Sequence, residues 1–461
     1  MKSIKQNNCP KVSVLMTTRN RPHLVRGAID SILMQAFQNF ELIIVDASDN
    51  RETGKIIQSY RHPKIRYVRK KCGIACGRNI GLRLSRAPYI TYCDDDERYY
   101  RNRLGELVRF LEKNPDVGLV YTDMLAININ NREKLFRMQY DFEKSHLESE
   151  CFFGVGNVMH RKKCIDLVGY YDERFIVAED WDFWLRISAH FKIARLAKVL
   201  HIYLIHGGNV TLNQRSDYGR AYECMIKKII KEKSAGEEGL KNFVSQSALP
   251  ILRNLLCLRK NSLAAYFIRT YCKNEASYQG VACFGLQELL KGRYHRGIHY
   301  FKKSLEIIAN NEKRLVSNAW QKENIALVYF YLAQGYLRVG NIFAAIEAAQ
   351  SAQSYSHRQF ISLLLTRCYI ETGCYPEALR QINDSPKESL YDFLNVKGCY
   401  YFAIRDFKNA VREFKKAVSF YPQFTIARHN LALAYQKLGR IDKSNAERRE
   451  IFRLKSKDCF F

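Results

Sequence analysis

The chain has 461 residues, more than one hydrophobic core usually serves, so we expect two or three domains. Its content of 47% hydrophobic and 26% charged residues is that of a globular protein and excludes a chain that is disordered throughout. The 74 Lys and Arg residues exceed the 46 Asp and Glu residues, and the formal net charge of +28 predicts attraction to phosphates, anionic lipids, nucleic acids or acidic glycans without choosing among them.

The N-terminal sequence and the cysteines bear on location. The opening MKSIKQNNCPKVSV lacks the apolar core of a secretory signal, and the fourteen cysteines are spread along the chain. Both observations favour the reducing cytoplasm. No apolar run is long enough to cross a bilayer, so we expect at most peripheral contact with an anionic membrane.

Short β-rich runs alternate with helical patterns in the first part of the chain, which is typical of a parallel sheet with crossover helices. The runs are Val12–Met16, Phe40–Val45, Ile65–Val68, Tyr89–Tyr92 and Gly118–Thr122. Between the first two runs, Val25, Ile29, Ile32 and Ala36 share one face of a helix that starts at Pro22. The sequence therefore predicts an α/β domain with its sheet covered by helices.

Polar clusters follow these runs, where ligands collect in open parallel sheets. They are TTRNRP at Thr17–Pro22, VDAS at Val45–Ser48, CDDDE at Cys93–Glu97 and, further on, AEDWDFWLR at Ala178–Arg186.

Three adjacent aspartates after an apolar strand, Asp94 to Asp96, allow two interpretations. A divalent cation would relieve their repulsion, since Mg2+ or Mn2+ prefers carboxylate and phosphate oxygens. Alternatively, the aspartates cap the N-terminus of a helix that we expect over Tyr99–Leu111. The triplet by itself leaves both interpretations open.

Taken together, the motifs resemble family 2 glycosyltransferases of the GT-A-type fold. KVSVLMTTRNRPHLVRGAIDSILMQAFQNFELIIVDAS resembles the family's nucleotide-binding opening, and GIACGRNIGLRLSRAPYITYCDDDERY resembles its middle segment with the aspartate motif. GNVMHRKKCIDLVGYYDERFIVAEDWDFWLRI resembles its acceptor and catalytic segment. The three segments stand in the family's order between about residues 10 and 210, so the resemblance implies a mostly parallel, GT-A-type nucleotide-sugar-binding sheet.

The resemblance implies a donor site. Asp46 would lie beside the base or ribose, with Thr17 and Arg19 as the other wall, and Arg78 would place a cation near the diphosphate. Two departures put the identity of the base in doubt. Ala47 stands where many relatives have a second acidic residue, and Arg19 stands where some users of uridine diphosphate have an aromatic residue. The planar guanidinium of Arg19 can still stack on a base.

The resemblance also implies a metal site for Mn2+ or Mg2+. Asp94 and Asp96 occupy the outer positions of the family's Asp-x-Asp motif, and Asp95 between them is grouped with the donor-binding residues. Asp96 is the expected direct metal ligand, with Asp94 as a second ligand. His206, in YLIHGG, resembles a family histidine near the metal or the diphosphate; its alternative is a turn histidine with no role.

For catalysis, Asp180 matches the proposed base of the family's Glu-Asp motif, with Glu179 beside it. A single base with no covalent intermediate implies inversion at the anomeric carbon. The neighbouring Asp182, Trp181 and Trp184 either contact the acceptor or pack in the core.

After about residue 278 the strand signals fade and a helical repeat appears. Its clearest unit has small and large residues spaced as in a 34-residue helix-turn-helix repeat: Gly398, Tyr401, Ala410, Phe414, Ala417 and Pro422. Related spacing occurs at Gly285, Gly292, Gly297 and Phe301; at Ala333, Tyr336, Gly340 and Ala345; at Tyr369, Gly373 and Ala378; and at Ala432, Tyr435 and Gly439. The pattern resembles tetratricopeptide repeats and predicts four or five stacked units in an all-α solenoid.

The expected domains are therefore a GT-A-type glycosyltransferase domain at 1–220, a helical connector at 221–277 and a tetratricopeptide-repeat domain at 278–461. The expected function is inverting, metal-dependent transfer of a sugar from a nucleotide diphosphate donor to a protein, peptide or glycan acceptor. We also expect a protein partner on the repeat array.

Three other functions compete with this one. The chain could be a non-catalytic repeat scaffold with a degenerate transferase domain, although Asp94, Asp96 and Asp180 are intact. Specific nucleic-acid binding is not expected, since no base-reading motif is present. A nucleotidyltransferase is disfavoured because the opening lacks a glycine-rich phosphate loop.

Overall fold

The computed structural model describes residues 9–129, 132, 134–137, 141–206, 208–209, 215–234, 237–258, 260–272, 277–311, 315–316, 318–386 and 390–458. The chain divides into two compact units, one made of Met1–Phe243 and Arg253–Leu263, the other of Val244–Leu252 and Ala264–Phe461. Most described residues of the segment 221–277, expected as a connector, are helical, and the segment contributes to both units.

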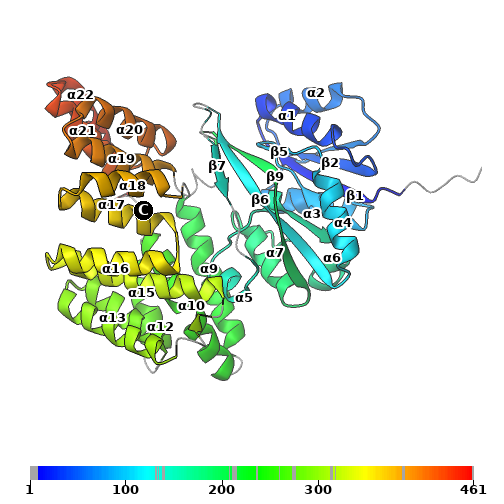
Figure 1. The fold of residues 1–461 in the computed structure, drawn as a ribbon. Helices are drawn as coiled ribbons and strands as arrows, with labels where there is room; N and C mark the ends of the chain where they lie inside the picture. The colour runs from blue at the N-terminus through cyan, green and yellow to red at the C-terminus, as the bar shows by residue number, and fades with distance from the viewer. Residues whose placement is uncertain are drawn as a thin grey trace, which may run out of the picture. The chain divides into compact units, whose positions relative to one another are not determined.

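The described residues of the first unit form one nine-stranded sheet (Figure 1). Its strands are β1 (Val12–Thr18), β2 (Phe40–Asp46), β3 (Ile65–Arg69), β4 (Tyr89–Tyr92), β5 (Glu97–Tyr99), β6 (Val117–Asn128), β7 (Lys134–Arg137), β8 (Val158–Arg161) and β9 (Lys192–Ile205). They lie in the order β3-β2-β1-β4-β8-β6-β9-β5, with β7 paired to β6. The expected fold class, a GT-A-type sheet followed by a helical solenoid, is confirmed.

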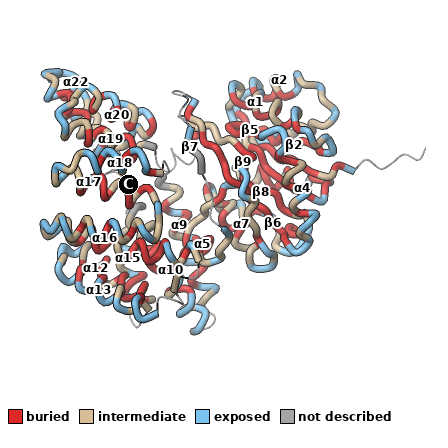
Figure 2. The backbone as a smooth tube through the Cα atoms, in the orientation of Figure 1, coloured by how far each residue is buried: buried red, intermediate tan, exposed pale blue. Residues whose placement is uncertain are grey.

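The half of the sheet formed by β1 to β4 is parallel, as the alternation of runs and helices predicts. The other half is mixed, because β8 pairs antiparallel with both β4 and β6 while β9 runs parallel to β6. The residues of β1, β2, β4 and β6 are almost all buried (Figure 2), whereas most residues of β3 and β9 are intermediate or exposed.

Helices of this unit cover the sheet. They are α1 (Pro22–Leu33), α2 (Glu52–Ser59), α3 (Ile74–Leu84), α4 (Arg103–Lys113), α5 (Lys144–Ser149), α6 (Lys163–Val168), α7 (Glu179–Ser188) and the short turn η1 (Val155–Asn157). The expected helix through Val25, Ile29, Ile32 and Ala36 is α1, in which Val25, Ile29 and Ile32 are buried in the core. The prediction was wrong for Ala36, because α1 ends at Leu33 and Ala36 is exposed. Pro22 occupies its first turn as expected.

The segment after the aspartate triplet differs from the expected helix. Glu97–Tyr99 forms β5, which pairs antiparallel with β9, and the helix α4 begins only at Arg103 with Asn102 as its N-cap. The prediction of a helix starting at Tyr99 was wrong, because pairing with a long neighbouring strand outweighs local helical preference there. The aspartates therefore do not cap this helix, which removes the structural alternative for the triplet.

The helical region of the chain contains α9 (Arg215–Lys233), α10 (Glu237–Cys257), α11 (Asn261–Phe267) and a π-helical turn η2 at Ile268–Cys272. It continues with α12 (Tyr278–Leu290), α13 (Tyr294–Ala309), α15 (Ala319–Arg338), α16 (Ile342–Tyr355), α17 (Gln359–Glu371), α18 (Tyr375–Asp384), α19 (Leu390–Ala403), α20 (Phe407–Phe420), α21 (Thr425–Lys437) and α22 (Ile441–Asp458). From α12 on, the described helices form five successive hairpins, each pairing a helix with the next (Figure 1).

The small residues of the repeat pattern lie where helices cross closely. A Cβ atom added to Gly398 would lie 2.5 Å from the ring of Phe414, so α19 and α20 cross too closely for any side chain larger than that of glycine at this position. Gly340 and Gly439, at the turns between paired helices, have φ values of +78° and +69°, which favour glycine. The repeat spacing thus reports both close helix crossings and turns.

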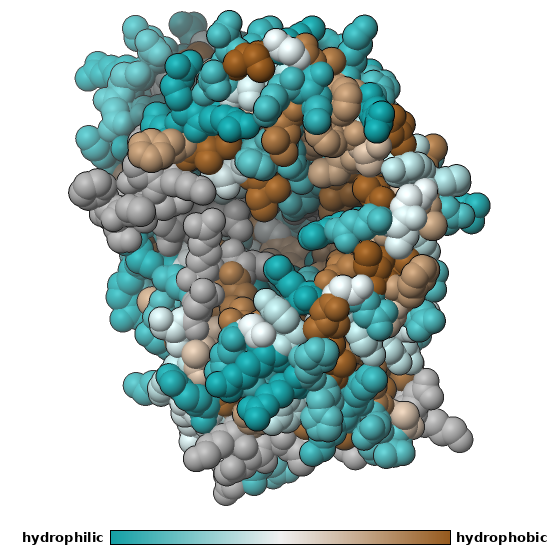
Figure 3. Space-filling model, turned by 90° about the vertical axis from the view of Figure 1, so that its left-hand side faces the viewer, coloured by the Kyte–Doolittle hydropathy of each residue, from teal (hydrophilic) through white to brown (hydrophobic). Residues whose placement is uncertain are grey.

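The view onto the side of the helical hairpins shows hydrophobic residues in separate patches within a largely hydrophilic surface (Figure 3). Exposed apolar side chains of these helices include Phe343, Ile426 and Phe452. Within the described part of the chain, no helix has both the length and the apolar content needed to span a membrane.

Candidate functional site

The polar clusters meet at the carboxyl ends of neighbouring strands. Thr18 at the end of β1 pairs in parallel register with Asp46 at the end of β2. On the other side of β1, Leu15 pairs with Tyr92, so the aspartates that follow β4 emerge at the same edge. Side chains far apart in the sequence are therefore brought together where a doubly wound sheet binds its ligands.

Asp94 is held by three contacts. Its Oδ1 accepts a hydrogen bond from Thr17 Oγ1 at 2.9 Å, and its Oδ2 accepts one from Arg78 Nη2 at 3.1 Å. Its backbone N–H donates to Glu97 Oε2 at 3.0 Å. The carboxylate is 20% exposed and is thus fixed while it still reaches the surface.

Asp95 lies deeper than Asp94 and is bound by two donors. Thr18 Oγ1 donates to its Oδ2 at 2.6 Å, and Arg21 Nη1 donates to its Oδ1 at 2.7 Å. Burial raises the pKa of Asp95 to about 6, and the charge of Arg21 opposes this rise. Asp95 therefore ties the end of β1 to the aspartate segment.

Asp96 Oδ2 receives three donors: Arg21 Nη1 at 3.0 Å, Asn209 Nδ2 at 3.1 Å and His206 Nε2 at 3.3 Å. Burial acts to raise the pKa of Asp96, but the hydrogen bond from His206 and the charge of Arg21 outweigh it and lower the pKa. His206 Nδ1 accepts from the backbone N–H of Gly208 at 3.0 Å, so the neutral ring carries its proton on Nε2. His206 thus stands beside Asp96 as a hydrogen-bond donor.

The second acidic pair begins α7. Ala178, just before it, has a φ of 61°, a left-handed conformation that is uncommon for a residue with a Cβ atom. Glu179 accepts a short hydrogen bond from Arg78 Nη1, and both side chains are about 95% buried. Because Arg78 also binds Asp94, one guanidinium joins the aspartate segment to the start of α7.

Burial dominates the titration of this pair. It raises the pKa of Glu179 to about 7, with Arg78 opposing, and it raises the pKa of the half-buried Asp180 in the same way. The pKa of Arg78 is itself raised, since its carboxylate neighbours Glu179 and Asp94 outweigh desolvation. Raised carboxylate pKa values suit proton transfer near neutral pH.

The predicted nucleotide residues are placed differently from one another. Asp46 is fully buried: its Oδ1 accepts from the Ser48 N–H at 2.9 Å and its Oδ2 from the Tyr67 hydroxyl at 3.0 Å. Arg19 is 60% exposed and its Nη2 donates to Asp49 at 3.3 Å. Direct contact between Asp46 and a nucleotide would therefore require a rearrangement that exposes the buried carboxylate, whereas Arg19 is already at the surface.

The side chains of α7 that follow the acidic pair belong to the core. Trp181 and Trp184 are fully buried, and Trp181 Nε1 donates to the carbonyl of Leu147 at 2.6 Å. Asp182 is 1% exposed and pairs with Arg186 and with Lys228. These buried side chains pack in the core, which is the second of the two interpretations.

Sequence reasoning assigned no role to several residues that build the site: Thr18, Arg21, Glu97, His201 and Asn209. Thr18, Arg21 and Glu97 lie inside the motifs TTRNRP and CDDDE, so their positions were a signal. His201 and Asn209 had no comparable signal, because only the pairing of β9 with β5 and β6 brings that part of the chain to the aspartates.

The described residues contain no group of three His, Cys, Asp or Glu side chains that could hold a metal ion by themselves. Asp96 and His206 offer one oxygen and one nitrogen 3.3 Å apart, a donor set that suits a divalent cation when a substrate supplies further oxygens. His206 could bind through Nε2 only after that atom loses its proton, at the cost of the bond from Gly208 to Nδ1.

The sequence is similar to known proteins in both parts of the chain. Residues 13–165 match the family model described as "Glycosyl transferase family 2", and residues 391–424 match one described as "Tetratricopeptide repeat". An uncharacterized glycosyltransferase of Rickettsia prowazekii is 28% identical over 268 residues, which are 54% of this chain and 83% of that protein. One of Methanocaldococcus jannaschii is 30% identical over 191 residues, 39% of this chain and 66% of that protein.

Among solved structures, S. aureus TarS 1-349 in complex with UDP-GlcNAc aligns with a TM-score of 0.46 and 16% identity, covering 75% of this chain and 91% of that chain. A longer TarS structure aligns with a TM-score of 0.42, and the chain spans 55% of its length. The chain is thus similar to glycosyl transferase family 2 over residues 13–165 and to tetratricopeptide repeats over residues 391–424.

Proposed function

We propose that this protein is an inverting, metal-dependent glycosyltransferase that moves a sugar from a nucleotide diphosphate donor to a protein, peptide or glycan acceptor. The observation that carries the proposal is the position of Arg78, whose guanidinium binds Asp94 and Glu179 at once. It joins a segment suited to a donor diphosphate with the acidic pair suited to an acceptor. This arrangement would bring the two substrates together at one place.

The chain's own residues would act as follows. Asp180, half-buried and with a raised pKa, accepts the proton of the attacking acceptor group as that group reaches the anomeric carbon. The bond from the anomeric carbon to the diphosphate oxygen breaks, and Arg78 faces the negative charge that develops. A single base without a covalent intermediate gives inversion.

A divalent cation, Mn2+ or Mg2+, would be held by Asp96, with Asp94 and His206 as neighbouring ligands and the diphosphate completing the shell. When bound, it would supply charge stabilisation to the leaving group. Arg21 pairs with Asp95 and Asp96 and so neutralises part of the negative charge of this segment. Arg19 and Thr17 would face the nucleotide, with Asp46 supporting the wall from beneath.

The repeat array would hold part of the acceptor or a protein partner. Stacked hairpins offer an extended surface, which commonly binds peptides or helices. The net positive charge of the chain would suit an acidic acceptor or a peripheral contact with an anionic membrane.

A panel of nucleotide sugars tests the proposal, each with Mn2+, with Mg2+ and with EDTA. The expected result is thermal stabilisation by one donor that requires the cation, together with release of its nucleoside diphosphate. The competing scaffold function predicts partner binding that Asp94→Asn, Asp96→Asn and Asp180→Asn leave unchanged, and no turnover of any donor.

A further inference from the structure

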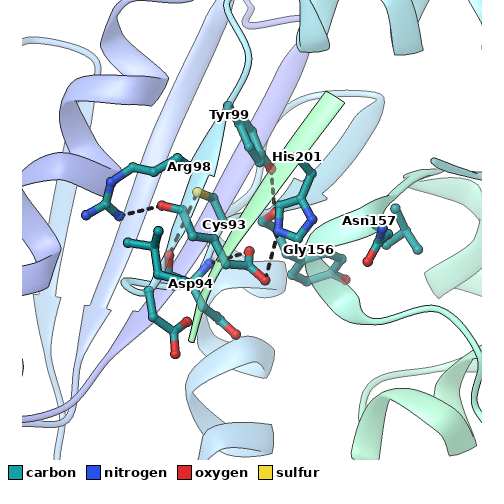
Figure 4. A network of polar contacts seen from close by, with 12 residues as sticks. Cys93, Asp94, Arg98, Tyr99, Gly156, Asn157 and His201 are labelled. Carbon is teal, nitrogen blue, oxygen red and sulfur yellow. Dashed lines mark hydrogen bonds and ion pairs between the residues drawn. The ribbon is translucent and has the colours of Figure 1, made fainter. Parts of the chain in front are cut away.

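A buried acidic residue lies directly behind the aspartate segment. Glu97 on β5 is 5% exposed, and its Oε2 accepts the backbone N–H of Asp94 at 3.0 Å. Its Oε1 lies 3.2 Å from Nε2 of His201 on β9, whose side chain is 2% exposed. Asp94, His201 and Gly156 converge on this point (Figure 4).

The surroundings leave Glu97 little freedom. A Cβ atom added to Gly156 would lie 2.2 Å from both carboxylate oxygens, so the backbone of η1 is packed against the carboxylate. The Gly156 carbonyl accepts a hydrogen bond from Nη2 of the fully buried Arg103 at 2.7 Å, which fixes η1 in turn. Glu97 is therefore confined between β9, η1 and the segment that it holds.

This arrangement is a poor one for stability. Within the described part of the chain, neither ring nitrogen of His201 makes a bond of hydrogen-bond geometry, although both are buried. A buried polar pair that is incompletely hydrogen-bonded seldom stabilises a fold relative to apolar residues of similar size. The contact that Glu97 does satisfy well is the one to the Asp94 amide.

We propose that Glu97 and His201 are positioning residues that hold the Asp94 backbone, and with it the donor-facing carboxylates, in the orientation needed to bind a nucleoside diphosphate. The effect on nucleoside diphosphate binding rests on the proposed function. The claim that Glu97 and His201 hold the Asp94 backbone is independent of that function. Glu97 fixes the amide of Asp94 from behind, while Thr17 and Arg78 fix its carboxylate from the front.

The test compares three variants of the full chain. Glu97→Met with His201→Leu replaces the pair by apolar residues of similar volume, and Glu97→Gln keeps an oxygen that can accept the Asp94 amide. The matched control is Glu41→Met, which removes a carboxylate that is 2% exposed in the same sheet, at the amino end of β2, where it binds Ser13 and the Arg86 amide.

Two readouts are needed: hydrogen exchange of the peptide that contains residues 93–97 without ligand, and affinity for the nucleoside diphosphate that binds the native chain best, from UDP, GDP, CDP, ADP and dTDP with Mn2+. The double variant should keep the native stability or exceed it. It should exchange the Asp94 amide about tenfold faster and lose about 10- to 100-fold in affinity. Glu97→Gln should retain most of both properties, and Glu41→Met should lose stability alone.

Native exchange and native affinity in the double variant would overturn the proposal, as would an equal loss of affinity in Glu41→Met. A native chain that binds none of the five diphosphates contradicts the proposed function, while the exchange measurement still decides whether the pair holds Asp94.

Discussion

The guanidinium of Arg78 on α3 pairs with the carboxylate of Glu179 at the start of α7, 101 positions further along the chain. Both side chains are almost fully buried, and Arg78 also binds Asp94. The guanidinium of Arg78 thus links two acidic segments that would otherwise repel each other. Loss of this side chain should affect both stability and turnover.

Arg78→Met leaves Glu179 buried without its partner. We expect the free energy of unfolding to fall by about 3 kcal/mol, as when one member of a buried pair is removed. Turnover of the donor should fall by about 10²- to 10³-fold, since a group that faces the leaving charge is gone. Urea unfolding and steady-state kinetics measure the two effects.

The double change Arg78→Met with Glu179→Met separates the effect of Arg78 on stability from its effect on turnover. Replacing both partners removes the unpaired charge, so stability should return toward the native value while turnover stays low. Recovery of turnover together with stability would show that Arg78 has only a structural role.

Asp180→Asn and Asp182→Asn form a matched pair on the first turn of α7. Asp180→Asn should reduce transfer by about 10²- to 10⁴-fold without loss of donor binding, because a general base is removed. Asp182 is buried against Arg186 and Lys228, so its replacement should lower stability and leave the turnover of the folded protein near native. The prediction fails if the two variants lose equal activity per folded molecule.

The pH dependence of transfer should reflect the burial of Asp180. Burial raises its pKa above the ordinary value of 3.8, and the base works only as the carboxylate. The acidic limb of the kcat/KM profile should therefore have its midpoint clearly above pH 3.8. A profile that stays flat down to pH 4 would rule out Asp180 as the base.

Much of the N-terminal fold could be predicted from sequence, because the apolar runs of β1 to β4 are continuous and separated by clear helical patterns. β5 could not, since Glu97–Tyr99 is short and polar and becomes a strand only by pairing with β9. β6 extends from Val117 to Asn128, well beyond the expected Gly118–Thr122, because β7 and β9 provide partners for its second half.

In the candidate site, too, some features could be predicted from the local sequence and others depend on contacts between distant parts of the chain. Asp94, Asp96 and Asp180 stand in motifs that resemble those of a family, so their grouping was predictable from their order along the chain. The placement of His206 against Asp96 depends on where β9 ends, which no local pattern reports. Asp46 was expected beside the nucleotide, and its complete burial reflects a hydrogen bond from Tyr67 on the neighbouring strand.

His160 on β8 should make stability depend on pH. Its Nδ1 lies 3.0 Å from the Arg161 carbonyl and its Nε2 lies 2.9 Å from the Tyr92 hydroxyl. Burial lowers its pKa from 6.5 to about 4. The neutral ring therefore stabilises the fold fully above pH 6.5, and this contribution, about 3 kcal/mol, is lost as the pH falls toward 4.

Urea unfolding of the native protein and of His160→Gln across pH 4 to 7 measures the pH-dependent stability that His160 contributes. Because the other titrating groups are common to both proteins, the native chain should lose about 3 kcal/mol more than the variant over this range. Parallel curves would contradict the assignment.

Gly398→Ala tests the repeat packing. The new Cβ atom would lie 2.5 Å from Phe414, so the hairpin of α19 and α20 should lose about 1–3 kcal/mol. Gly105→Ala in α4 is the control, since its nearest contact would be an ordinary 3.7 Å and a helical alanine should stabilise by about 0.5–1 kcal/mol. Thermal unfolding of both variants checks this, and equal effects would contradict the close crossing.

The proposed function requires a nucleotide diphosphate site formed by the aspartate segment and α7. The most direct measurement is release of nucleoside diphosphate from the donor panel with Mn2+, by the native chain and by Asp96→Asn and Asp180→Asn. We expect cation-dependent release from one donor by the native chain, loss of donor binding in Asp96→Asn, and retained binding with little release in Asp180→Asn. Nucleoside diphosphate release that is equal in all three proteins, or absent with every donor, would contradict the proposed function.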